Sequence, residues 1–103
     1  MKVRNVGLSE RLWFKNKIIH CGDEEFDLAA LKRILVQVSD LSFVDDTVRL
    51  NLDFGDVSLI VPSMHKSYDM LFEKLSKSLK LDDEAYLRAM NCDRSCDFVI
   101  YQP

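Results

Sequence analysis

The chain has 103 residues, of which 48% are hydrophobic and 30% charged, with only three glycines and two prolines. This composition is typical of a single globular domain with its own hydrophobic core, and it excludes a disordered or fibrous chain. The net charge of −3 argues against nucleic acid as a general partner, since such a footprint needs a dominant basic surface. The uncharged apolar runs are too short for a bilayer, which needs about 20 residues, so no membrane insertion is expected.

The N-terminal segment does not have the pattern of a cleaved secretion signal. Glu10 and Arg11 interrupt the stretch where a signal peptide has its apolar core. The chain has three cysteines, Cys21, Cys92 and Cys96, and an odd number argues against a fully paired disulfide framework. Free thiols fit a reducing compartment, so we expect a cytoplasmic location.

The first well-marked strands are predicted over Arg11–Lys15 and Ile18–Cys21, on either side of a turn at Asn16. Both segments are rich in β-branched and aromatic residues, which favour strands. Strand alternation would bury Trp13 and place its two sequence neighbours on the opposite face. We therefore expect a large apolar side chain of that opposite face to be exposed or covered by a partner.

This N-terminal hairpin also belongs to the basic part of the chain. Residues 1–22 carry five basic side chains against one acidic side chain, so the acidic excess lies in the rest of the chain. Aromatic and basic residues alternate closely in the hairpin, a composition that favours contact with an acidic partner surface. The candidate partner-binding residues here are Trp13, Phe14, Lys15 and Lys17.

Residues 27–37 are compatible with two structures. Asp27, followed by leucines at helical spacing, fits a capped helix, whereas the β-branched run Ile34–Val38 favours a strand. We prefer a strand with a local kink and leave the helix open. The segment Ser39–Asp46 is rich in serine and aspartate and is predicted to be a loop.

The strongest local signal is a β-hairpin that begins at Val48. Apolar and polar residues alternate from Val48 to Phe54, as in a half-buried strand, and Gly55–Asp56 offers a two-residue turn with positive φ at the glycine. A slip by one residue would set apolar against polar side chains, so the register is well specified. The expected pairs are Phe54 with Val57, Leu52 with Leu59 and Leu50 with Val61.

Two helices and a last strand are predicted after this hairpin. Pro62 ends the second strand, and a helix with one apolar stripe follows to about Leu79. Asp82 is a good N-cap for a short helix over Asp83–Met90. The run Phe98–Tyr101 is β-branched and aromatic and predicts a terminal strand.

Together these elements predict one α+β domain over residues 1–103. We expect an antiparallel, curved or barrel-like sheet of six to seven short strands, packed by one main C-terminal amphipathic helix, with a second short helix and a terminal strand.

The segment Val48–Pro62, continued by Tyr68–Leu75, carries a resemblance at the level of pattern, over about residues 48–79. A hairpin, a proline and a long amphipathic helix in this order are similar to bacterial pleckstrin-homology-like domains, which end in a curved sheet closed by a helix. The resemblance implies a scaffold used mostly for protein contacts. The family's phosphoinositide-binding pattern is missing, because Lys15 and Lys17 are not followed by a further basic pair, so lipid-headgroup binding is not expected.

Residues with catalytic or metal-binding chemistry do not form a recognisable motif. His20, Cys21, Cys92 and Cys96 have the right chemistry for zinc, but adjacent His20 and Cys21 do not form half of a zinc knuckle. No flanking signature supports a Cys–His nucleophilic pair, and there is no glycine-rich phosphate loop. We expect no metal, no cofactor and no enzymatic activity, and we expect His65 to be exposed on the first turn of the main helix.

Carboxylates gather at three places that the sequence predicts to be turns or caps. These are Asp23-Glu24-Glu25, Asp45-Asp46 and Asp82-Asp83-Glu84. Acidic patches steer association with basic proteins, so we count Asp45, Asp46, Asp82, Asp83 and Glu84 as further candidate partner-binding residues.

The sequence favours a non-enzymatic protein-binding or adaptor domain that acts through the N-terminal hairpin or a sheet edge. An unprotected edge at Phe98–Tyr101 would also permit a homodimer. The alternative is a small acidic toxin-neutralising (immunity) protein that binds and blocks a toxin enzyme.

Overall fold

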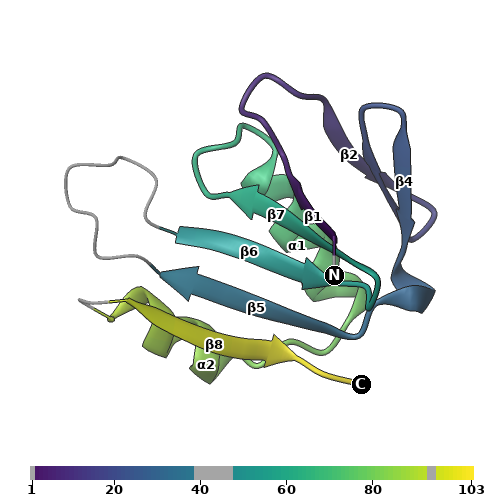
Figure 1. Cartoon of the computed structure of the whole chain (residues 1–103). Coiled ribbons are helices and arrows are strands. Elements are labelled where there is room, and N and C mark those ends of the chain that lie inside the picture. The colour runs from purple at the N-terminus through teal and green to yellow at the C-terminus, as the bar shows by residue number, and fades with distance from the viewer. Residues whose placement is uncertain (1, 39–47, 93–94) are drawn as a thin grey trace.

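The described part of the chain forms two β-sheets and two α-helices (Figure 1). A computed structural model describes residues 2–38, 48–92 and 95–103. Sheet A has the strand order β1-β7-β6-β5-β8, with the bounds Lys2–Asn5, Val57–Pro62, Val48–Asp53, Arg33–Val38 and Cys96–Tyr101. Sheet B is the meander β2-β3-β4, with the bounds Leu12–Lys15, Ile18–Cys21 and Glu24–Asp27. The helices are α1 (Tyr68–Ser78) and α2 (Asp83–Met90).

This arrangement confirms the α+β class and the main helix, the second short helix and the terminal strand. Among residues 2–38 and 48–67, seven strands precede α1, and β8 follows α2. In the part of the chain that the structure describes, neither sheet closes into a barrel. Both helices lie behind sheet A in Figure 1, so its other face carries no helix there. Among these same residues no helix is long and apolar enough to cross a membrane.

The β6–β7 hairpin has the predicted register. Leu52 lies opposite Leu59, and Leu50 lies opposite Val61. Gly55 has a φ of +94°, and its N–H donates to Asp53 Oδ1 over 2.8 Å. The turn therefore depends on a glycine that tolerates positive φ and on a local carboxylate that binds its main chain.

The expectation of an antiparallel sheet is wrong at one edge, because β1 runs parallel to β7. Lys2 lies opposite Val57 and Asn5 lies opposite Ile60. A parallel pair needs a long connection, and here it includes all of sheet B and the strands β5 and β6. No local pattern in the sequence reports such a pairing.

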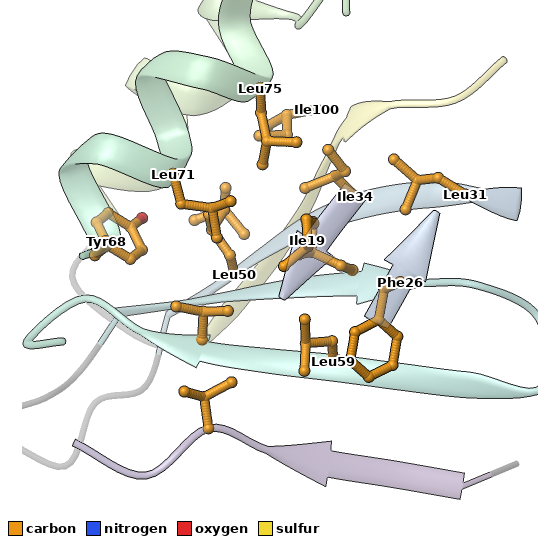
Figure 2. Close-up of a cluster of buried hydrophobic side chains, with 14 of the residues drawn as sticks. Ile19, Phe26, Leu31, Ile34, Leu50, Leu59, Tyr68, Leu71, Leu75 and Ile100 are labelled. Atoms are coloured by element: carbon orange, nitrogen blue, oxygen red, sulfur yellow. The ribbon is translucent and has the colours of Figure 1, made fainter. Parts of the chain in front are cut away.

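One hydrophobic core joins the two sheets and α1 (Figure 2). Leu71 and Leu75 of α1 point toward sheet A and are essentially inaccessible to solvent. Sheet B contributes Ile19 and Phe26 to the same cluster. The amphipathic stripe of α1 therefore packs as the sequence predicts, and the N-terminal hairpin packs into the same core.

In the ambiguous segment 27–37 the preferred strand is confirmed; a short 3-10 turn precedes it, and the longer capped helix does not form. Asp27 Oδ1 accepts a hydrogen bond from Ala29 N–H over 2.9 Å and caps a single 3-10 turn over Leu28–Ala30. The strand then begins at Arg33. Capping chemistry decides the first residues and β-branching decides the rest.

Three local predictions are wrong. Glu24 and Glu25 lie in strand β4 rather than in a turn, because the neighbouring Phe26 is buried against the core. The first turn of α1 begins at Tyr68, so His65 precedes the helix, and it is buried rather than exposed. Cys92 and Cys96, expected as free thiols, are joined in a disulfide, whereas Cys21 is free and buried.

Candidate functional site

The outer face of sheet B carries an aromatic and charged array. The inward residues of the three strands enter the core, so the alternate residues lie on the opposite side of the sheet. Trp13 pairs with His20, which pairs with Glu25, and Lys15 pairs with Ile18, which pairs with Asp27. We call these six residues the hairpin face: Trp13, Lys15, Ile18, His20, Glu25 and Asp27.

The centre of the hairpin face is a stack of planar side chains. The Trp13 and His20 rings are nearly parallel, with an interplanar angle of 6° and 4.7 Å between centroids. The Arg11 guanidinium carbon lies 4.6 Å from the centroid of the Trp13 ring, a cation–π contact. These contacts hold the indole in one orientation while leaving it half-buried, so ordering it on binding costs little entropy.

The predicted partner-binding residues of the N-terminal hairpin do not all lie on one face of sheet B. Trp13, expected to be buried, lies on the outer face, whereas its neighbours Leu12 and Phe14 point toward the core. The orientation follows from how sheet B packs, because its Leu12 and Ile19 face meets the interior while its Trp13 face does not. Lys15 belongs to the hairpin face, and Lys17 lies in the turn with a φ of +61°.

Arg11 and His20 were not among the predicted site residues, although the sequence contains a signal for His20. A two-residue turn at Asn16 and Lys17 sets Lys15 against Ile18 and therefore places Trp13 opposite His20. Counting the register from the turn would have found this pair.

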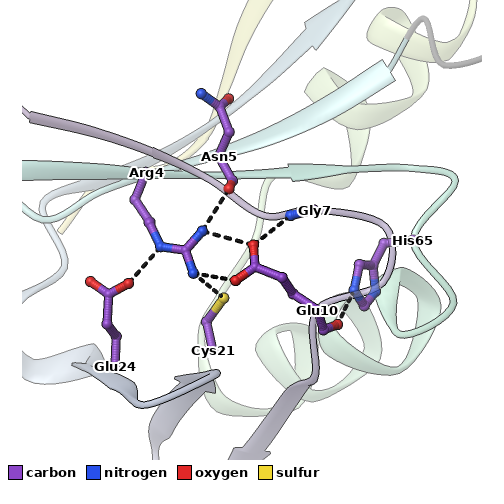
Figure 3. A network of polar contacts seen from close by, with 7 residues as sticks. All are labelled: Arg4, Asn5, Gly7, Glu10, Cys21, Glu24 and His65. Carbon is purple, nitrogen blue, oxygen red and sulfur yellow. Dashed lines mark hydrogen bonds and ion pairs between the residues drawn. The ribbon is translucent and has the colours of Figure 1, made fainter.

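A polar network anchors sheet B to β1 (Figure 3). The Arg4 guanidinium binds Glu10 through both terminal nitrogens and Glu24 through Nε. Glu10 Oε1 also accepts from Gly7 N–H over 2.7 Å. One side chain of β1 thus holds the segment before β2 and the first residue of β4, and it fixes how the hairpin face is presented.

His65 supports the same segment from the other side. Its Nε2 lies 2.8 Å from Glu10 O, and its Nδ1 accepts from Ser67 N–H over 3.0 Å. Because a carbonyl oxygen only accepts, Nε2 is the nitrogen that donates in this contact. The buried imidazole is therefore a structural bridge between the β1–β2 connection and the start of α1.

The network shifts the acid–base properties of its members. The hydrogen bonds from Arg4 lower the pKa of Glu10 to about 2, and the Gly7 N–H acts in the same direction. The same bonds raise the pKa of Arg4. Burial raises the pKa of the Cys21 thiol, whose Sγ lies 3.5 Å from the Arg4 guanidinium, so this cysteine is not an activated nucleophile.

The stability contribution of Glu10 should depend on pH in a defined window. Its carboxyl pKa falls from an ordinary 4.5 to about 2 in the folded state, so folding favours the ionised form. The contribution is complete above about pH 4.5 and is lost as pH falls toward about 2. Urea midpoints of the wild type and Glu10→Gln should therefore differ at neutral pH and converge in this window. A difference between the two proteins that stays constant with pH would contradict the network.

The predicted acidic residues lie apart from the hairpin face. Asp82, Asp83 and Glu84 line a groove of about 610 Å³ beside the edge strand β8. Asp82 Oδ1 caps α2 by accepting from Ala85 N–H over 3.0 Å, as predicted. Asp45 and Asp46 lie outside the described residues.

The residues considered for catalysis or metal binding are not brought together. His20 lies on the outer face of sheet B, whereas Cys21 points into the core. Cys92 and Cys96 are bonded to each other. Among residues 2–38, 48–92 and 95–103, no three His, Cys, Asp or Glu side chains are arranged to hold a metal ion.

Comparison with known protein families, curated proteins and solved structures finds no match for this chain. The resemblance to bacterial pleckstrin-homology-like domains therefore stays a prediction.

Proposed function

We propose that this chain is a non-enzymatic protein-binding domain that presents the hairpin face to a partner protein. The observation that carries the proposal is the stack of Arg11, Trp13 and His20 on a rigid meander. Tryptophan and arginine are the residues most enriched among the energetically dominant positions of protein interfaces. A stack held in place by its own contacts binds without a large loss of side-chain entropy.

The charges around the stack set the kind of surface it prefers. Arg11 and Lys15 lie on the β2 side, and Glu25 and Asp27 lie on β4. The hairpin face is therefore basic on the β2 side and acidic along β4. A complementary partner surface is acidic where it meets β2 and basic where it meets β4. Such a pattern favours a folded protein surface over a uniformly charged polymer such as nucleic acid.

The experiment is a comparison of Trp13→Ser with the matched variant Leu87→Ser. Both replace an exposed or half-buried apolar residue, and Leu87 lies on α2 away from sheet B. A partner captured by the wild type and identified by mass spectrometry should bind Leu87→Ser with unchanged Kd. Its affinity for Trp13→Ser should fall at least about tenfold.

Circular dichroism and urea midpoints control for the fold in both variants. A folded Trp13→Ser protein that binds the identified partner as tightly as the wild type does would refute the role of the hairpin face.

A second candidate function is toxin neutralisation, and the grouping of Asp82, Asp83 and Glu84 along one groove favours it. A basic toxin enzyme would be steered to such a surface by long-range electrostatics. Its association rate should fall steeply between low and physiological salt. A partner whose association rate does not depend on salt would rule this candidate out.

A further inference from the structure

The groove beside β8 has an open strand edge as one of its walls. β8 is the last strand of sheet A, and among the described residues it pairs with β5 alone. Val99, Ile100, Tyr101 and Gln102 form this wall, and residues 80–84 form the other. Val99 is 40% exposed, so the edge is reached from solvent.

The direction of the free main-chain groups of β8 follows from the ladder of sheet A. Ser63 N–H donates to Val48 O over 2.9 Å, so the even-numbered residues of β6 bond to β7. The odd-numbered residues of β6 then bond to β5, and the even-numbered residues of β5 bond to even-numbered partners on β8. The N–H and C=O groups of Asp97 and Val99 therefore point away from β5.

Among residues 2–38, 48–92 and 95–103, the far end of this edge carries a main-chain hydrogen bond. A register shift opposite Ile34 and Leu35 turns the Ile100 carbonyl outward, where it accepts from Asp82 N–H over 2.7 Å. This bond ties the start of α2 to the strand end and holds the two walls of the groove together. No further strand of the described part of the chain pairs with the outward groups of Asp97 and Val99, which lie next to this bond as a template for one more strand.

The charges that line the groove determine which kind of segment could pair with the β8 edge. Of the charged residues that line the groove in the described part of the chain, three are acidic, Asp82, Asp83 and Glu84, and one is basic, Lys80. Glu84 is only loosely paired, since Arg88 lies 4.0 Å away. We propose that this groove binds an extended basic segment of a partner protein as an added β-strand along β8. Alternate residues of that strand lie on the side of α2, where basic ones meet Asp83 and Glu84, and the others lie beside Val99, where apolar ones fit.

A second copy of this chain is a poorer occupant of the same edge. Pairing β8 with β8 would bring Asp97 and the acidic start of α2 of one copy close to the same residues of the other. Like charges at such distances oppose pairing, whereas a basic segment gains attraction from each of them.

The test measures binding of labelled peptides of about eight residues, with arginine or lysine alternating with valine, by fluorescence anisotropy against the full chain. We expect saturable binding with Kd on the order of micromolar. The same peptides are made with main-chain N-methyl groups on every odd or every even residue. Only one of the two sets removes the donors that face β8, so one set should lose binding and the other should keep it.

Two variants locate the site on this chain. Val99→Pro removes an N–H that points away from β5, so the fold should persist while peptide binding is lost. Asp83→Asn with Glu84→Gln should weaken binding at least about fivefold. The matched control, Asp23→Asn with Asp56→Asn in two exposed turns, removes the same charge and should leave binding unchanged. Trp13→Ser should also leave it unchanged, so failure at the hairpin face and failure here are distinguishable.

Several results would overturn the proposal. These are absence of saturable binding by the alternating peptides, equal behaviour of the two N-methylated sets, and equal loss of binding in the acidic variant and its control. A wild-type dimer in sedimentation that Val99→Pro converts to a monomer would instead identify a second copy as the occupant, and it would equally overturn the proposal.

Discussion

Replacing Leu52 by Asp is expected to unfold the domain. Leu52 is fully buried in the middle of β6, opposite Ile34 on one side and Leu59 on the other. An aspartate there loses the buried apolar contacts and places a carboxylate where no partner compensates it. Such substitutions lower the free energy of unfolding by more than about 4 kcal/mol. This is a large part of the 5–15 kcal/mol that is the typical free energy of unfolding of a whole domain. Circular dichroism should show loss of helix, and the variant should no longer unfold cooperatively in urea.

The control for this experiment lies on the same strand. Arg49 is exposed on the other face of β6, so Arg49→Asp introduces the same side chain without burying it. Its free energy of unfolding should change by less than about 1 kcal/mol. If both variants unfolded, general charge repulsion rather than core burial would be the cause.

Ile19→Ala should destabilise both sheets together. Ile19 lies in sheet B, is inaccessible to solvent and belongs to the same cluster as Leu50 and Leu71 (Figure 2). Removing its side-chain carbons leaves a cavity at the junction of the two sheets and should cost about 2–5 kcal/mol. Because the core is shared, the loss should lower the unfolding midpoint of the whole domain rather than of the hairpin alone.

The chain contains its own probes for this distinction. Trp13 is the single tryptophan and reports on sheet B through its fluorescence, whereas the helices that dominate far-ultraviolet circular dichroism pack against sheet A. The two signals should give the same urea midpoint in the wild type and in Ile19→Ala. A fluorescence transition that moves alone would show that sheet B unfolds separately, and it would contradict the prediction of one domain.

The features that the sequence predicts well depend on neighbours in the chain. The β6–β7 register follows from a two-residue turn and strict alternation, and α2 follows from the cap at Asp82. The features that the sequence does not predict are contacts between residues that lie far apart along the chain. Nothing near Arg4 indicates that it will bind Glu24, and nothing near His65 indicates that Glu10 O will satisfy its ring and allow it to be buried. The expected burial of Trp13 is wrong because strand alternation defines two faces but does not say which of them meets the core.

The acidic residues illustrate the same limit for the site. Composition identifies Asp82, Asp83 and Glu84 as a charged cluster, but only the pairing of β8 with β5 places an open strand edge beside them. The groove is a product of topology, and its recognition chemistry comes from residues that are distant along the chain.

The parallel pairing of β1 with β7 also constrains the order in which the molecule folds. β1 is synthesised before the other strands described, yet its hydrogen-bonded neighbour contains residues 57–60, which leave the ribosome only after both strands β5 and β6. Contacts of such long range form slowly because a large loop must close first. The Arg4 network depends on the same strand, so its ion pairs with Glu10 and Glu24 need not form until β1 docks. The beginning of the chain is therefore expected to be among the last parts of sheet A to reach its native position.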